Sequence, residues 1–126
     1  MSISLRLLAG RFAVCRLDPR DEIPSWATGE FVSFARTTEE LSIVCSEDSV
    51  PDSIRSERGW RCLKLSGPIP FETTGIAASI ASPLAEAGIS LFLVSTFDTD
   101  YVLVKGAALA NAIAALRASG WNVSET

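Results

Sequence analysis

The sequence predicts an α+β protein made of two units with antiparallel sheets, each in the order strand–helix–strand–strand–helix–strand, the first degenerate with reduced helices. The second half of the chain shows this order clearly, and the first half repeats it with weak helical segments. The two halves also align at a shift of about 60 residues. The 126 residues suffice for two very small units. The predicted boundaries are 1–60 for the N-terminal unit and 61–126 for the C-terminal unit.

The first half contains three predicted strands, at 12–17 (FAVCRL), 31–36 and 41–45, each an apolar segment bounded by turn residues. Two prolines and a glycine leave room for at most one helical turn in 18–30. A short, polar and weak helix is expected at 50–59. The helical segments of this half are therefore reduced.

The second half opens with a predicted strand at 60–66, and a helix is predicted over 75–87. Apolar residues recur on one face of this helix, at Ile76, Ile80, Leu84 and Ala87. Pro83 lacks the N–H that the helical ladder needs, so we expect it to kink the helix or split it into two turns.

A hairpin and a second helix complete the second half. The alternating segments 90–96 and 101–105 are joined by FDTD, which predicts two antiparallel strands. An alanine-rich helix is predicted at 107–120, and a short last strand at 121–123. The apolar stripe of this helix comprises Leu109, Ile113 and Leu116.

The repeat is clearest in the two hairpins, where 34–45 (FARTTEELSIVC) aligns with 94–105 (VSTFDTDYVLVK). The strand at 60–66 is placed to end the first unit and begin the second. Residues 2–9 can supply an additional strand. The sequence leaves open how the two sheets share these segments.

Charge and composition exclude several classes of function. The formal net charge is −4, from 11 basic and 15 acidic residues, whereas a nucleic-acid surface needs a basic excess. The chain has no histidine, which removes histidine-based acid–base and nucleophilic chemistry and histidine-ligated metals. We therefore expect no catalytic residue, no metal and no cofactor.

The cysteines and the apolar segments indicate a compartment. Cys15, Cys45 and Cys62 lie in apolar segments and form no CxxC pair. We expect buried, reduced thiols and hence a cytoplasmic protein, with a reactive thiol as the alternative. No signal peptide is evident, and no segment approaches the ~18 apolar residues of a membrane span. Neither nucleic acid nor a membrane is expected as a partner.

Two segments of the second unit suit a small charged ligand. In PFETTGI, the N–H groups of a helix start and the hydroxyls of Thr73 and Thr74 suit a carboxylate. In STFDTD, Asp98 and Asp100 suit an ammonium group. Taken alone, the first segment fits a plain helix cap and the second a polar turn better than a ligand contact, and a calcium loop would lack further oxygen ligands. Together they match a free amino acid, which carries both charged groups on one carbon.

The first unit has a related acidic turn. Glu39 and Glu40 mirror Asp98 and Asp100, and they form either a second, pseudo-symmetric site or a solvated turn. Nearby basic residues are expected to form a solvated face, with an interface as the alternative: Arg55, Arg58 and Arg61.

The segment 60–123, above all GPIPFETTGIAASIASPLAEAGISLFLVSTFDTDYVLVKG, resembles the C-terminal half of small bacterial ACT-domain proteins. That family is related to the ACT regions of aspartate kinases and of the cytosolic arginine sensors of animal cells. The first half, with GRFAVCRLDP and RTTEELSIVC, resembles the N-terminal repeat of the same proteins. The resemblance implies a tandem ACT protein whose ferredoxin-like units bind amino acids at the seam between them.

Carried onto this sequence, the resemblance implies two contact segments for a ligand. The first is a loop with one residue a helical turn later: Thr73, Thr74, Gly75, Ile76 and Ser79. The second follows the predicted strand of the hairpin: Ser95, Thr96, Phe97, Asp98, Thr99 and Asp100.

These features predict a regulatory protein that binds a free amino acid and has no catalysis of its own. The alternative is a structural or oligomerisation module of a cytoplasmic complex that binds no ligand. The sequence leaves open whether the partner is a second copy of the chain or a separate regulated protein.

Overall fold

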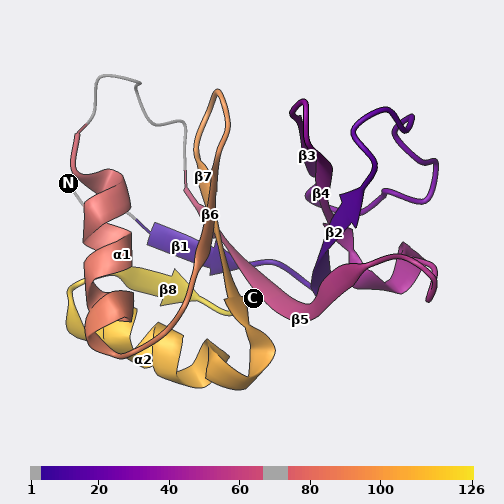
Figure 1. Ribbon diagram of the computed structural model, residues 1–126. Helices are drawn as coiled ribbons and strands as arrows, with labels where there is room; N and C mark the ends of the chain where they lie inside the picture. Colours follow the sequence, from indigo (N-terminus) through magenta and orange to yellow (C-terminus); the bar gives the residue numbers. More distant parts are fainter. Residues whose placement is uncertain (1–3, 67–73) are drawn as a thin grey trace. The chain divides into compact units, whose positions relative to one another are not determined.

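The computed structural model describes residues 4–66 and 74–126, which divide into two compact units (Figure 1). The N-terminal unit comprises residues 9–60. The C-terminal unit comprises residues 61–126 together with the stretch that ends at Leu8. Strand β5 (Ser56–Leu65) gives its first residues to the N-terminal unit and its last residues to the C-terminal unit. The question of how this strand is shared, which the sequence leaves open, is thereby answered.

The N-terminal unit keeps the predicted strand order without α-helices in its described residues. Its strands are β2 (Phe12–Leu17), β3 (Ser33–Arg36), β4 (Leu41–Ser46) and the start of β5, in the spatial order β3-β4-β2-β5. All neighbouring pairs are antiparallel. A loop joins β2 to β3, and a short 3-10 helix, η1 (Glu47–Ser49), follows β4. The prediction of a degenerate first unit with reduced helices is confirmed.

Loops cover the core of this unit where helices would otherwise lie. The core faces of β2 and β4 contribute buried residues such as Ala13, Leu41 and Ile43. Trp26 from the first loop and Ile54 from the second pack against them. Burial of these apolar side chains stabilises the unit in the way that a helix face would.

The C-terminal unit has the complete order of elements. After β5 come α1 (Ile76–Glu86), β6 (Phe92–Ser95), β7 (Asp100–Lys105), η2 (Gly106–Ala108), α2 (Leu109–Ala118) and β8 (Asn122–Ser124). Strand β1 (Ser4–Leu7) lies between β5 and β8, antiparallel to the first and parallel to the second. The candidate strand in 2–9 therefore exists and is part of this sheet. The α+β fold of two such units is confirmed.

Both helices pack on the core of the C-terminal sheet (Figure 1). Ile80 and Leu84 of α1 and Leu116 of α2 are fully buried, as the apolar stripes of the sequence predict. Ile76 is half-buried against the same core, whereas Ala87 is exposed at the C-terminal end of α1.

Helix α1 continues through Pro83 as one helix, so of the two expected outcomes, a kink or a split into two turns, the split does not occur. Pro83 has no N–H to donate to the carbonyl of Ser79, one turn earlier. The indole N–H of Trp121 donates to that carbonyl instead, at 3.1 Å. The hydrogen bond from Trp121 satisfies the acceptor that the proline leaves open.

The weak helix expected at 50–59 is also wrong. From Ser56 onward this segment is strand β5, and it pairs with β2 through Cys15–Ser56 and Val14–Glu57. Pairing along the open edge of β2 outweighs the weak local helical propensity of these polar residues.

The three cysteines are buried and free. Within the described part of the chain, no helix is long and apolar enough to cross a membrane.

Candidate functional site

The β6–β7 turn and the described start of α1 lie at the same end of the C-terminal unit (Figure 1). The hydroxyl of Thr99 is buried and donates a 2.7 Å hydrogen bond to the carbonyl of Leu65, the last residue of β5. This bond fixes the β6–β7 turn beside the end of β5, from which the chain leads to α1. Figure 1 shows the hairpin tip and the first turn of α1 at one end of this unit.

The β6–β7 turn is closed by its own hydrogen bonds. The backbone N–H and the hydroxyl of Thr96 donate to the carbonyl of Thr99, at 2.8 and 3.1 Å. The N–H of Thr99 donates back to the Thr96 hydroxyl at 3.3 Å. Ser95, the last residue of β6, is paired with Asp100, the first residue of β7. The threonines therefore hold the turn, while Asp98 is exposed, Phe97 is 80% exposed and Asp100 is half-buried.

The start of α1 presents backbone groups rather than a side-chain cap. Its N-cap is Gly75, whose φ of 81° is readily adopted by glycine and which has no side chain to accept first-turn N–H groups. Thr74 is exposed beside it, and Thr73 lies outside the described residues. The hydroxyl of Ser79 donates to the carbonyl of Gly75 at 2.8 Å. Ile76, at the first helical position, packs against the core.

This end of the unit combines two opposite charge preferences. The first-turn N–H groups of a helix carry partial positive charge and suit an anion. Asp98 and Asp100, in the β6–β7 turn, carry carboxylates that can accept hydrogen bonds from a cation. The N–H groups of the helix start and the two carboxylates together suit a small molecule with one anionic and one cationic group.

The hairpin of the N-terminal unit repeats the same turn. The N–H of Thr37 donates to the carbonyl of Glu40 at 2.9 Å, and the N–H of Glu40 donates to the Thr37 hydroxyl at 3.1 Å. The strand register matches as well, with Arg36 opposite Leu41 as Ser95 is opposite Asp100. The true shift is therefore one residue shorter than in the alignment of 34–45 on 94–105, and Glu40 corresponds to Thr99.

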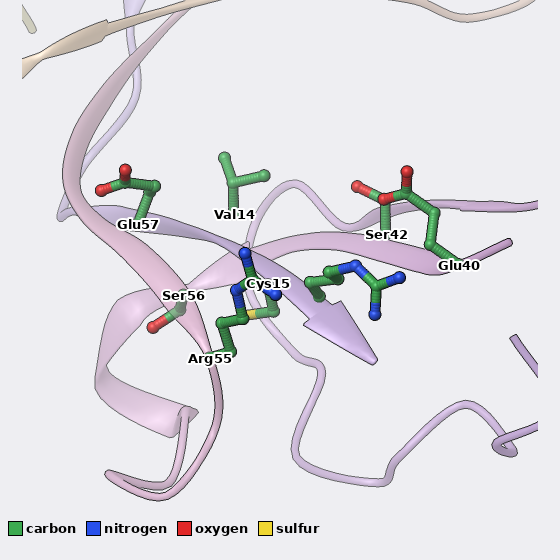
Figure 2. A pocket seen from close by; sticks show the side chains of 8 residues that line it. Val14, Cys15, Glu40, Ser42, Arg55, Ser56 and Glu57 are labelled. Carbon is green, nitrogen blue, oxygen red and sulfur yellow. The ribbon is translucent and has the colours of Figure 1, made fainter. Parts of the chain in front are cut away.

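A hollow of about 330 Å³ lies on the N-terminal unit (Figure 2). Its lining residues come from β2, β4, β5 and the adjoining turns: Val14, Cys15, Arg16, Glu40, Ser42, Arg55, Ser56 and Glu57. Of these, the sequence singled out Glu40 in the acidic turn and Arg55 in a solvated face. The hollow itself was missed, because strand pairing brings together residues that are far apart in the chain.

Two of the cysteines interact inside the N-terminal core. A hydrogen bond with Cys45 raises the pKa of the Cys15 thiol, and burial raises it further. The same hydrogen bond lowers the pKa of Cys45, and a hydrogen bond with Ser49 lowers it further, while burial acts in the opposite direction. Both side chains belong to the packed core of the unit.

Comparison with known proteins identifies the fold. A family model described as an ACT domain matches residues 55–118, about half of the chain. The chain belongs to the ACT domain family. A second family model, of an N-terminal domain, matches residues 10–53 of this ACT protein.

Relatives of the ACT chain include both bacterial and animal proteins. A crystal structure of an Agobacterium tumefaciens protein is 42% identical, with a TM-score of 0.93, and the match covers 100% of this chain and 95% of that one. The human cytosolic arginine sensor for mTORC1 subunit 1 is 48% identical over 46 residues. That match covers 36% of this chain and 14% of the sensor, so the chain spans only a small part of this relative.

Aspartate kinases share the fold at low identity. The regulatory subunit of aspartate kinase from Thermus flavus is 9% identical with a TM-score of 0.63, and the match covers 94% of this chain and 97% of that one. Aspartate kinase from Clostridium acetobutylicum is 14% identical with a TM-score of 0.67, over 93% of this chain and 34% of the kinase. The predicted resemblance to ACT regions of aspartate kinases and arginine sensors is confirmed.

Proposed function

We propose that the chain is a regulatory module that binds a free amino acid and performs no catalysis of its own. Membership of the ACT family carries the proposal. Two relatives support it: one is named as an arginine sensor and another as a regulatory subunit of an aspartate kinase. The sensor's name also supports a cytosolic location.

The proposed ligand site lies at the shared end of α1 and the β6–β7 turn. The N–H groups after Gly75 and the hydroxyls of Thr73 and Thr74 receive the α-carboxylate. Asp98 and Asp100 receive the ammonium group. Ile76 and Phe97 offer apolar surface to the ligand side chain, and the turn residues position the two carboxylates: Ser95, Thr96 and Thr99. Ser79 holds the carbonyl of Gly75 and thereby steadies the loop.

Regulation follows if the ligand favours one conformation over another. A ligand can shift an equilibrium only by its difference in affinity for the two states. A partner that binds one of these states then senses the amino acid through a coupling free energy of about 1–3 kcal/mol.

A thermal-shift screen of the whole protein against each of the twenty standard amino acids tests this function. A ligand present at about 100 times its Kd raises the free energy of unfolding by about 2.7 kcal/mol. We expect one or a few amino acids to raise the Tm of the wild type. Asp98→Ala abolishes the shift, whereas Asp52→Ala, at an exposed position in the other unit, leaves it unchanged.

A module for assembly alone is the second candidate. Within the described residues, β6 pairs with β7 and with no other strand, and its Phe92, Leu93 and Val94 form a short apolar edge. Such edges can pair with a second chain. If none of the amino acids moves the Tm, and light scattering shows a dimer that Val94→Lys converts to a monomer, the assembly role replaces the binding role.

A further inference from the structure

The hollow on the N-terminal unit has a defined face. Val14 is opposite Glu57, and Arg16 is opposite Ser42, so these four side chains share one face of the sheet. Figure 2 shows Glu57 and Glu40 at opposite ends of the hollow, with Val14 between them. Ala13, one residue before Val14, belongs to the packed core on the other face. The lining is thus held in place by strand pairing and by the core behind it.

The hollow gathers charged side chains of both signs, among them Arg16, Glu40 and Arg55. The guanidinium of Arg16 donates to the backbone carbonyl of Glu39 at 3.0 Å, which holds it in position. Among the residues that the structure describes, none forms an ion pair with the side chain of Arg16, Glu40 or Arg55. Arg16, Glu40 and Arg55 line one hollow and can each contact a ligand there.

The charge pattern selects the class of ligand. An anion such as phosphate would suit the two arginines but would meet Glu40 and Glu57 in the same hollow. A simple amine would suit the carboxylates but would meet Arg16 and Arg55 in the same hollow. A molecule with one carboxylate and one ammonium group satisfies both, and a hollow of about 330 Å³ has the size of a small-molecule site.

The two hairpins differ at the turn position that lines this hollow. Thr99 of the C-terminal turn is buried and bonded to the end of β5. Its counterpart, Glu40, is longer and charged and lines the hollow instead. The turn is retained, but the position that is sealed in one unit carries a carboxylate in the other.

We propose that this hollow is a second ligand site, which binds a free zwitterionic amino acid. Arg16 and Arg55 hold the α-carboxylate. Glu40, with the hydroxyl of Ser42 beside it, accepts hydrogen bonds from the ammonium group. Glu57 lines the opposite end of the hollow. The inference shares with the proposed function only the class of ligand, since its residues lie in the other unit.

Backbone amide NMR of the whole protein, titrated with each of the twenty standard amino acids, tests the site. We expect at least one amino acid to shift the amides of Val14, Arg16 and Ser42 at millimolar concentration. Arg55→Gln and Glu40→Gln each weaken this binding by about tenfold, because each removes a charge-assisted hydrogen bond. The matched controls Arg20→Gln and Glu22→Gln, at exposed positions of the same unit, leave the affinity unchanged.

A steric variant tests the hollow without touching its charges. Val14→Phe fills the space between the two ends and abolishes the shifts, while the remaining amide spectrum reports whether the fold is retained. Sodium acetate, methylamine and inorganic phosphate serve as single-charge probes. If any of them shifts the same amides with equal affinity, the requirement for a zwitterion is wrong and the proposal is overturned.

The same titrations distinguish failure of this second site from failure of the proposed site at Asp98. Asp98→Ala removes the response of the β6–β7 turn and leaves that of the hollow, and Arg55→Gln does the reverse. If no amino acid shifts the amides of the hollow while those around Asp98 respond, the second site is absent and the proposed function stands. If only the hollow responds, the second site stands and the assignment of Asp98 falls.

Discussion

The two units share a strand order and a hairpin turn but differ in what covers their sheets. The C-terminal unit covers its core with α1 and α2, whereas the N-terminal unit uses side chains from loops, such as Trp26 and Ile54. The threonine-closed turn is nevertheless the same in both. The order of strands therefore depends on sheet pairing and buried strand faces, and the connecting segments can be shortened without changing it.

The largest expected effect is in the helical cover of the C-terminal unit. Leu84 of α1 is fully buried. Leu84→Ala removes apolar contacts and leaves a cavity, so we expect a loss of about 3 kcal/mol in the free energy of unfolding. Urea denaturation measures this loss. Leu109→Ala, at a partly buried position of α2, should cost clearly less, and equal losses would contradict a core centred on α1.

A smaller effect is expected where Thr99 ties the turn to β5. Thr99→Val keeps the shape but leaves the carbonyl of Leu65 without its hydroxyl partner. Because a buried unsatisfied acceptor is costly, the variant should lose about 2 kcal/mol. The exposed Thr38, in the matching turn of the other unit, provides the control Thr38→Val, for which we expect no measurable change. The same loss in both variants would show that the bond to Leu65 is not what makes Thr99→Val costly.

The loop cover of the N-terminal unit should contribute less than the helices. Ile54 is half-buried against β2 and β4. Ile54→Ala should therefore cost about 1 kcal/mol, since only part of its apolar area is removed from water. Ile23→Ala, at a 37% exposed position in the other loop, is the control. A cost as large as that of Leu84→Ala would mean that loops and helices cover the two cores equally well.

The strands and their repeat could be predicted because each carries a short apolar segment bounded by turn residues, as in FAVCRL and YVLVK. The segment 56–59 could not, since its polar residues become a strand only by pairing with β2. The same holds for the hollow. The sequence marks Glu40 only as part of an acidic turn and Arg55 only as part of a basic face, and it does not mark Arg16; strand pairing brings the three to one surface. Asp98 and Asp100 were evident because they are neighbours in the chain.

The smallest effect concerns Pro83, which the sequence predicts to kink or split α1. The carbonyl of Ser79 receives the indole N–H of Trp121 where Pro83 offers none. Trp121→Phe removes this donor, and Pro83→Ala restores a helical N–H to the same carbonyl. In a double-mutant cycle followed by urea denaturation, we expect a coupling free energy of about 0.5 kcal/mol, because Trp121→Phe costs less once residue 83 can donate. Loss of ring packing is common to both backgrounds and cancels in the cycle. Additive losses would show that the indole contributes by packing alone and that α1 tolerates Pro83 without a substitute donor.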